Sequence, residues 1–177
     1  MKKIALVGAT LVLAMVAGTA SAANSLNAGT VGLNVPFTVP QYSVGGGVTI
    51  GDPLISGKYF IGKDLAILGG FGFATGGPSG ATTTVLRIMG GVKKYFGTND
   101  FAPFVGGKLD YQSIATTGAP SNTGTTIGVI AGAEYFLAKQ FSIDGTVGFG
   151  LVSANAAGTS ATVFGSSTLG LSANFYF

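Results

Sequence analysis

Apolar and polar residues alternate with a period of two along most of this chain. The last twelve residues show the pattern well, with small or polar residues between Leu169, Leu171, Ala173, Phe175 and Phe177. A period of two gives an extended strand one apolar face and one polar face. Stretches of this kind recur, and we predict eight strands, over residues 28–37, 49–61, 65–74, 83–96, 101–114, 126–137, 141–152 and 161–177. Residues 42–50 either extend the second strand or form a hairpin with the first.

Two kinds of connection separate these strands. Short charged connections lie at residues 62–64, 97–100 and 138–140. Longer connections made of Gly, Ser, Thr, Ala and Pro are expected at residues 75–81, 115–125 and 153–160, and within 38–53. Alternation of tight turns with longer loops is typical of antiparallel transmembrane barrels. The pattern therefore predicts an all-β protein, an eight-stranded antiparallel up-and-down transmembrane β-barrel.

The charged residues of the strands share one face, except Lys94, which points outward one step from a turn, where it can reach the lipid headgroups. When the apolar positions of each strand point outward, the inward side chains include Lys58, Arg87, Lys93, Lys108, Asp110, Glu134 and Asp144. This arrangement avoids the cost of about 2–4 kcal/mol for a Lys or Arg on the lipid face at mid-membrane. Because the lumen of an eight-stranded barrel is just wide enough for its own side chains, we expect these groups to pair in a structural network. The alternative is an ion or solute path, for which inward glycines would leave room.

Aromatic residues gather beside the short charged turns and at the C-terminus. Outward by parity are Tyr59, Phe96, Phe101, Tyr135, Phe141, Phe175 and Phe177. Aromatic side chains concentrate at membrane–water interfaces. We therefore predict a membrane-interface girdle on the periplasmic side, where the short turns and both chain ends would lie.

Composition supports a membrane protein without a spanning helix. The chain is 47% hydrophobic and only 8% charged, with a mean hydropathy of +0.55, whereas soluble domains are about 25% charged. No apolar run of about 18 residues follows the N-terminal segment, which leaves a β-barrel as the membrane-spanning structure. Membrane lipid would then surround the strands.

The N-terminal segment has the features of a secretory signal peptide. Lys2 and Lys3 precede an apolar stretch, and Ala20-Ser21-Ala22 supplies small residues for cleavage. We predict a signal peptide over residues 1–22 and a barrel domain over residues 23–177; the alternative is an uncleaved helical anchor. Removing two lysines lowers the net charge from +3 to about +1, so the basic pI is no reason to expect nucleic-acid binding.

Candidate catalytic chemistry is nearly absent from the sequence. There is no histidine and no cysteine, which removes Ser-His triads, most zinc sites and disulfides. The glycine runs at residues 45–47 and 69–72 lack the lysine and the helix of a phosphate-binding loop. We expect no enzymatic activity, no cofactor and no metal.

Several segments carry a family resemblance. GKYFIGKDLAILGGFGF, FAPFVGGKLDY, GAEYFLAKQFSIDGTVGFG and the terminal NFYF resemble the outer-membrane β-barrel domain family, which includes small barrels of the OmpA transmembrane domain, OmpX and OmpW type. The resemblance spans residues 23–177 and implies a location in the outer membrane of the Gram-negative cell envelope, where we expect a monomer. It also implies assembly by periplasmic chaperones and the barrel-insertion machinery. The assembly signal would comprise Leu169, Leu171, Ala173, Phe175 and Phe177.

The resemblance leaves the molecular activity open. This chain departs from the OmpA pattern, because no peptidoglycan-binding domain follows the barrel, and it lacks the long hydrophilic loops of an adhesin. The first hypothesis is a structural or surface protein with a side-chain-filled polar lumen. The second is a narrow porin-like channel for small or hydrophobic solutes, with an interior continuous with water or a side opening. The third is a secreted, calycin-like ligand binder, which would need an apolar lumen and a polar exterior.

Overall fold

A computed structural model describes residues 26–37, 41–44, 48–51, 54–97, 100–156 and 158–177, so the predicted signal peptide lies outside the described residues. No helix in these ranges is long and apolar enough to cross a bilayer. The described strands are β1 (Val31–Pro36), β2 (Gln41–Val44), β3 (Val48–Gly51), β4 (Ile55–Phe60), β5 (Leu65–Gly76), β6 (Thr83–Tyr95), β7 (Phe101–Thr116), β8 (Asn122–Ala138), β9 (Phe141–Ala156) and β10 (Thr159–Tyr176).

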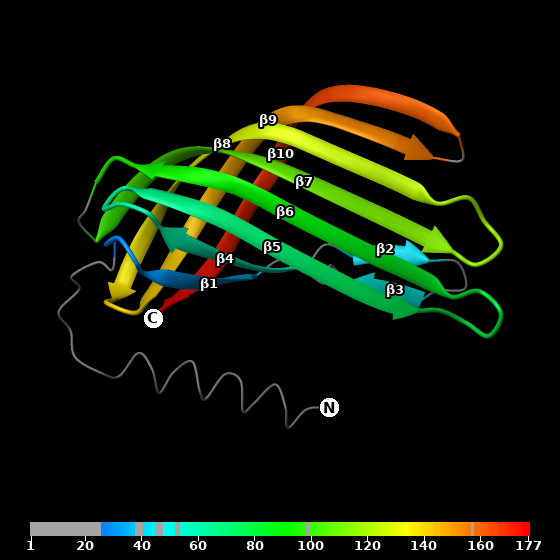
Figure 1. The fold of residues 1–177 in the computed structure, drawn as a ribbon, viewed down its shortest axis with the longest axis horizontal. Helices are drawn as coiled ribbons and strands as arrows, with labels where there is room; N and C mark the ends of the chain where they lie inside the picture. The colour runs from blue at the N-terminus through cyan, green and yellow to red at the C-terminus, as the bar shows by residue number, and fades with distance from the viewer. Residues whose placement is uncertain (1–25, 38–40, 45–47, 52–53, 98–99, 157) are drawn as a thin grey trace.

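Eight of these strands form a closed antiparallel barrel in the order β1-β10-β9-β8-β7-β6-β5-β4 (Figure 1). Closure depends on β1, which pairs with β10 on one side, with Gly32 opposite Tyr176, and with β4 on the other, with Val31 opposite Tyr59. The eight-stranded barrel predicted from the sequence is confirmed.

The second predicted strand, residues 49–61, is wrong at its start. The barrel strand begins at Ile55, and β2 and β3 pair with each other as a separate hairpin. The hairpin therefore neither extends the second strand nor pairs with the first. The sequence has Pro40 and Pro53 on either side of these two strands, and proline cannot donate to a strand ladder.

Apart from the connection between β1 and β4, which runs from residue 37 to residue 54 and includes β2 and β3, the connections differ less between the two ends of the barrel than the sequence suggested. We call the end with connections 61–64, 96–100 and 139–140 the turn end, and the end with connections 77–82, 117–121 and 157–158 the loop end. The long loops expected at residues 115–125 and 153–160 are wrong, because most of these residues belong to strands. Ile114 pairs with Asn122, and Thr159 with Ala156. The Thr, Ser and Ala residues there fit strand ladders as well as loops, and threonine favours strands.

The two faces of the barrel wall differ as the parity predicted. Ile127 and Val129 of β8 point outward and are 58% and 63% exposed, while Glu134 of the same strand points inward and is fully buried. The buried apolar cluster lies inside the barrel at the turn end. It comprises Leu26, Phe60, Ala66, Tyr95, Ala102, Phe104, Phe136 and Tyr176.

Candidate functional site

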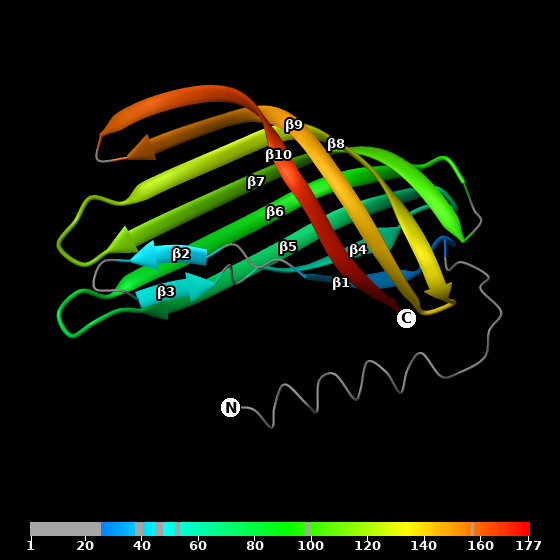
Figure 2. The same cartoon turned by 180° about the vertical axis from the view of Figure 1, so that it is seen from behind.

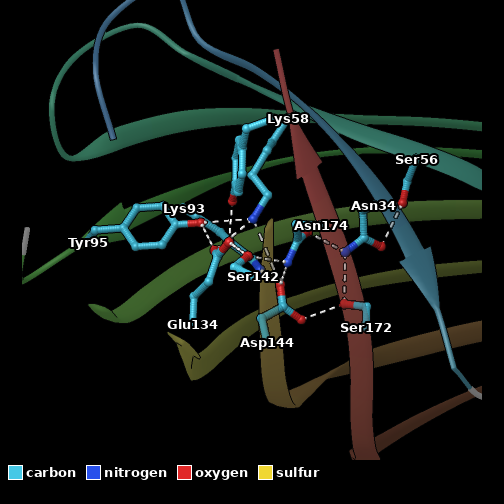
Figure 3. A network of polar contacts seen from close by, with 11 residues as sticks. Asn34, Ser56, Lys58, Lys93, Tyr95, Glu134, Ser142, Asp144, Ser172 and Asn174 are labelled. Carbon is cyan, nitrogen blue, oxygen red and sulfur yellow. Dashed lines mark hydrogen bonds and ion pairs between the residues drawn. The ribbon is translucent and has the colours of Figure 1, made fainter. Parts of the chain in front are cut away.

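The carboxylate of Glu134 is the centre of a polar network inside the turn end (Figure 3). Its Oε2 atom accepts hydrogen bonds from Lys58 Nζ at 2.7 Å and from the Tyr95 hydroxyl at 2.9 Å. Its Oε1 atom accepts from the hydroxyls of Ser142 and Tyr176. Donors from β4, β6, β9 and β10 thus meet on one carboxylate of β8, which ties distant parts of the wall together.

A second carboxylate, Asp144 of β9, extends the network. Lys93 Nζ lies 3.0 Å from its Oδ2 atom, and Lys58 Nζ lies 3.9 Å from the same atom. Ser172 and Asn174 of β10 also donate to Asp144. Lys58 and Lys93 balance Glu134 and Asp144, so the network is neutral overall, as a buried group of charges requires.

Amide and hydroxyl groups continue the network to the closing strands. Asn34 of β1 donates to Ser172 Oγ and to Asn174 Oδ1, both at 2.8 Å, and accepts from Ser56 of β4 at 3.1 Å (Figure 3). These bonds cross the β1–β10 and β1–β4 seams from the inside. The polar network therefore supports barrel closure as well as charge burial.

Aromatic rings fill the lumen at the turn end, next to the charged network. Phe60, Tyr95, Phe104, Phe136 and Tyr176 are all at most 2% exposed, and their neighbouring ring centroids lie 5.5–6.2 Å apart. Lys93 Nζ lies 3.9 Å from the Phe104 ring centroid, a cation–π geometry. Together with the network, these rings occlude the turn end of the lumen, and we call them the aromatic plug.

A separate ion pair lies nearer the loop end. Arg87 makes a two-pronged contact with Asp110, Nε to Oδ1 at 2.8 Å and Nη2 to Oδ2 at 2.5 Å. Lys108 makes no ion pair with any carboxylate in the described part of the chain. Two lumen cavities meet at Arg87 and Lys108. One of about 290 Å³ lies toward the network, and one of about 540 Å³ lies toward the loop end.

The structure therefore places all seven sequence-predicted lumen charges inside the barrel, but not in one network. Lys58, Lys93, Glu134 and Asp144 form the turn-end group, while Arg87 and Asp110 pair separately. Lys94, which the parity puts outside, pairs with Asp64 at the surface, and both side chains are about half exposed.

The residues predicted for the membrane-interface girdle do not all have the same surroundings. Tyr59, Phe96, Phe101 and Tyr135 are 49–66% exposed at the turn end. Phe141 and Phe175 are cross-strand neighbours with ring centroids 5.2 Å apart, and Phe141 is only 8% exposed. Of the terminal-strand residues, Leu171 is exposed, Ala173 is buried and Phe177 is 79% exposed; the side chain of Leu169 is outside the described set.

Sequence reasoning missed the uncharged part of the site. Asn34, Ser56, Ser142, Ser172, Asn174, Tyr95 and Tyr176 all contribute to the network. Each occupies an inward position by parity, so polar residues at those positions were the available signal. In the described part of the chain, no group of three or more acidic residues has the geometry to hold a metal ion.

Fold and site together define a small closed β-barrel with an apolar exterior and a charged, occluded lumen. No protein-family model matches the sequence, and no curated protein sequence matches it. Solved structures that are similar to this chain include the following three. The N-terminal β-barrel domain of OprF from Pseudomonas aeruginosa has a TM-score of 0.47 and 17% identity, covering 85% of this chain and 98% of that one.

The second is Ail, the attachment invasion locus protein of Yersinia pestis, with a TM-score of 0.42, 14% identity, and coverage of 85% of this chain and 99% of that one. The third is OmpT, an outer membrane protein of Vibrio cholerae, with a TM-score of 0.38, 19% identity, and coverage of 80% and 48%. At these levels the similarity concerns the fold alone.

Proposed function

We propose that this chain is an integral outer-membrane β-barrel protein with a structural or surface role. The observation that supports the proposal is the inverted distribution of side chains. Large apolar side chains such as Phe71, Ile88 and Val129 are 50–63% exposed on the outer face, while Lys58, Lys93, Glu134 and Asp144 are at most 6% exposed inside. Hydrocarbon surrounding the wall would bury the first set, and where β1 and β4 close the barrel no backbone edge is left in lipid.

The same distribution argues against a secreted, calycin-like binder. Such a barrel needs a polar exterior and an apolar lumen. In this barrel the largest fully buried side chains include Glu134 and Asn174, and the apolar residues of β5–β9 line the outside. A soluble protein would expose an apolar surface far larger than monomers tolerate.

Occlusion of the turn end argues against an open channel along the barrel axis. A solute entering from the loop end would meet the network around Glu134 and then the aromatic plug, whose rings are almost fully buried. Passage would require breaking several charge-assisted hydrogen bonds at once. The porin-like alternative therefore receives less support than a structural role.

Single lysine substitutions on the two faces of β8 test the membrane location. Val129→Lys puts a charge on the outer face, whereas Thr126→Lys puts one inside, across from Asp110 and at the edge of the larger cavity. We expect Val129→Lys to lower the unfolding free energy in bilayers by about 2–4 kcal/mol, and Thr126→Lys to have a much smaller effect.

The readout is urea unfolding in lipid vesicles, followed by heat-modifiable gel mobility, together with fractionation of cells that express the full chain. Recovery of the wild-type protein in the outer-membrane fraction would support the proposal. A wild type that is soluble without detergent, and a Val129→Lys variant as stable as Thr126→Lys, would refute it.

A further inference from the structure

The larger lumen cavity combines a polar floor with apolar walls. It measures about 540 Å³, within the range of about 300–1,000 Å³ usual for small-molecule sites. Arg87, Lys108, Asp110 and Gln112 line one part of it. Ile114, Ile130, Val152 and Ala154 line much of the rest. This combination suits an amphipathic molecule better than water or a simple ion.

The floor of the cavity favours an anionic group. Asp110 is already held by both prongs of Arg87, and Lys108 has no carboxylate within 4.0 Å in the described ranges. Counted over the described residues lining the cavity, two cations face one anion. The Gln112 Nε2 atom is buried without a hydrogen-bond partner among the described residues. A buried donor without a partner is costly, and a ligand oxygen would satisfy it.

The wall beside this cavity is incomplete toward the loop end. The paired part of β1 reaches only Ser172 of β10, and the paired part of β4 reaches only Phe71 of β5. Beyond these points, residues 159–167 of β10 pair with β9 alone, and residues 72–76 of β5 pair with β6 alone, among the strands that the structure describes. Strand β3 of the separate hairpin lies beside β5 without pairing with it. In Figures 1 and 2 the loop-end half of β10 stands apart from that of β5.

Apolar side chains of the inner face are exposed beside this seam. Val152 and Val163 are opposite each other on β9 and β10, so they share a face, and Val152 lines the cavity. They are 41% and 61% exposed. An apolar surface thus leads from the cavity toward the open seam between β10 and β5.

We propose that this cavity binds a single-chain fatty carboxylate. The carboxylate would accept from Lys108 Nζ and Gln112 Nε2, and the alkyl chain would lie against Ile114 and Val152 and extend toward the seam. A single chain fits, because a barrel of eight strands holds at most one small ligand. The inference does not depend on the membrane location, since cavity, charge and seam are properties of the barrel itself.

Displacement of a dansyl-labelled undecanoic acid from the refolded mature protein in phosphatidylcholine nanodiscs tests the site. We expect dodecanoate to compete, and dodecanol and butyrate to compete at least about tenfold less well, because one lacks the charge and the other the chain. Variants of Lys108 test the anionic part of the site. Lys108→Gln should weaken dodecanoate binding about tenfold, which is the contribution expected of one charge-assisted hydrogen bond. Lys108→Arg should bind like the wild type. The matched control is Lys94→Gln, which removes an exposed lysine paired with Asp64 and should leave binding unchanged.

Heat-modifiable mobility of each variant separates loss of binding from loss of folding. Equal competition by dodecanol and dodecanoate would overturn the proposal. So would unchanged binding in a folded Lys108→Gln variant. Loss of probe binding in discs that contain phosphatidylglycerol would assign the site to a bilayer lipid headgroup and overturn the single-chain assignment.

Discussion

The ring of Phe104 occupies the space that a side chain on Gly132 would need. A methyl group at Gly132 would lie 2.8 Å from Phe104 Cζ and 2.0 Å from the carbonyl oxygen of Gly145 on β9. Both distances are shorter than carbon atoms tolerate, and the second involves backbone. Gly132 thus allows β8 and β9 to lie close together and lets a plug ring lie across the wall.

The first prediction concerns this contact. Gly132→Ala must move a strand or displace Phe104, and we expect a loss of about 1–3 kcal/mol, the usual cost of overpacking. Gly90→Ala is the control, because a methyl group there would meet nothing within 4 Å. Urea unfolding in vesicles measures both variants. Equal stabilities would show that the plug is loosely packed.

The second prediction concerns the carboxylate of Glu134. Glu134→Gln leaves Lys58 buried beside a neutral group, and we expect a loss of about 3–5 kcal/mol, as for other broken buried ion pairs. Asp64→Asn breaks the exposed pair with Lys94, which should cost less than about 1 kcal/mol.

A double-mutant cycle tests whether the pair with Lys58 causes the loss. Lys58→Met combined with Glu134→Gln removes both charges, so the double variant should be more stable than the sum of the single effects predicts. Simple additivity would mean that the other donors to Glu134, Tyr95 and Tyr176 among them, dominate its contribution.

The third prediction concerns conductance through the turn end. The refolded wild type should give no reproducible steps in planar bilayers, because the network and the aromatic plug occlude the lumen. Phe60→Ala and Phe136→Ala remove two fully buried rings, and Glu134→Ala removes the carboxylate at the centre of the network, so the three changes combined should produce small steps. Reproducible steps from the folded wild type would instead favour the channel hypothesis, and their sensitivity to Arg87→Ala would locate the path.

The fourth prediction concerns Phe177, which we propose as part of the assembly signal. Its side chain is 79% exposed, while its backbone N–H donates to the Val31 carbonyl at 2.9 Å. Phe177→Ala keeps that bond, so refolding in detergent should be unchanged, whereas the amount of folded protein in outer membranes should fall. Phe164→Ala, which removes an exposed ring on β10, is the control and should leave both the refolding yield and the amount in outer membranes unchanged. Unchanged yield of Phe177→Ala in cells would remove the proposed role.

The sequence predicted the inside and outside of the wall because strand parity is a local property. Once Val129 points outward, Glu134 must point inward, whatever its partners are. The ion-pair partner of an inward charge, by contrast, depends on residues far away in the sequence. Arg87 and Lys108 both point inward and both carry a positive charge, yet only Arg87 pairs with Asp110.

The sequence could not predict where the wall is incomplete. Within the expected loop at 153–160, residues 153–155 pair with both β8 and β10, whereas residues 159–160 pair with β9 alone, and composition does not reveal which residues have a partner on only one side. A β-bulge between Ser167 and Gly170 also changes the register, so Phe164 is opposite the outward Leu151 although its number is even. Period-two reasoning fails at such a point, because it assumes an unbroken ladder.

The Tyr176 hydroxyl reaches Glu134 from the second-last residue of the chain, and Leu26 joins the plug from before the first barrel strand. The buried centre of this molecule therefore cannot be completed one hairpin at a time. It is completed only when β1 and β10 have paired, so its stabilising contacts form late in folding and at the same time. We expect a folding reaction with few stable intermediates. A chain in which β1 and β10 have not yet paired remains accessible to chaperones and to proteases.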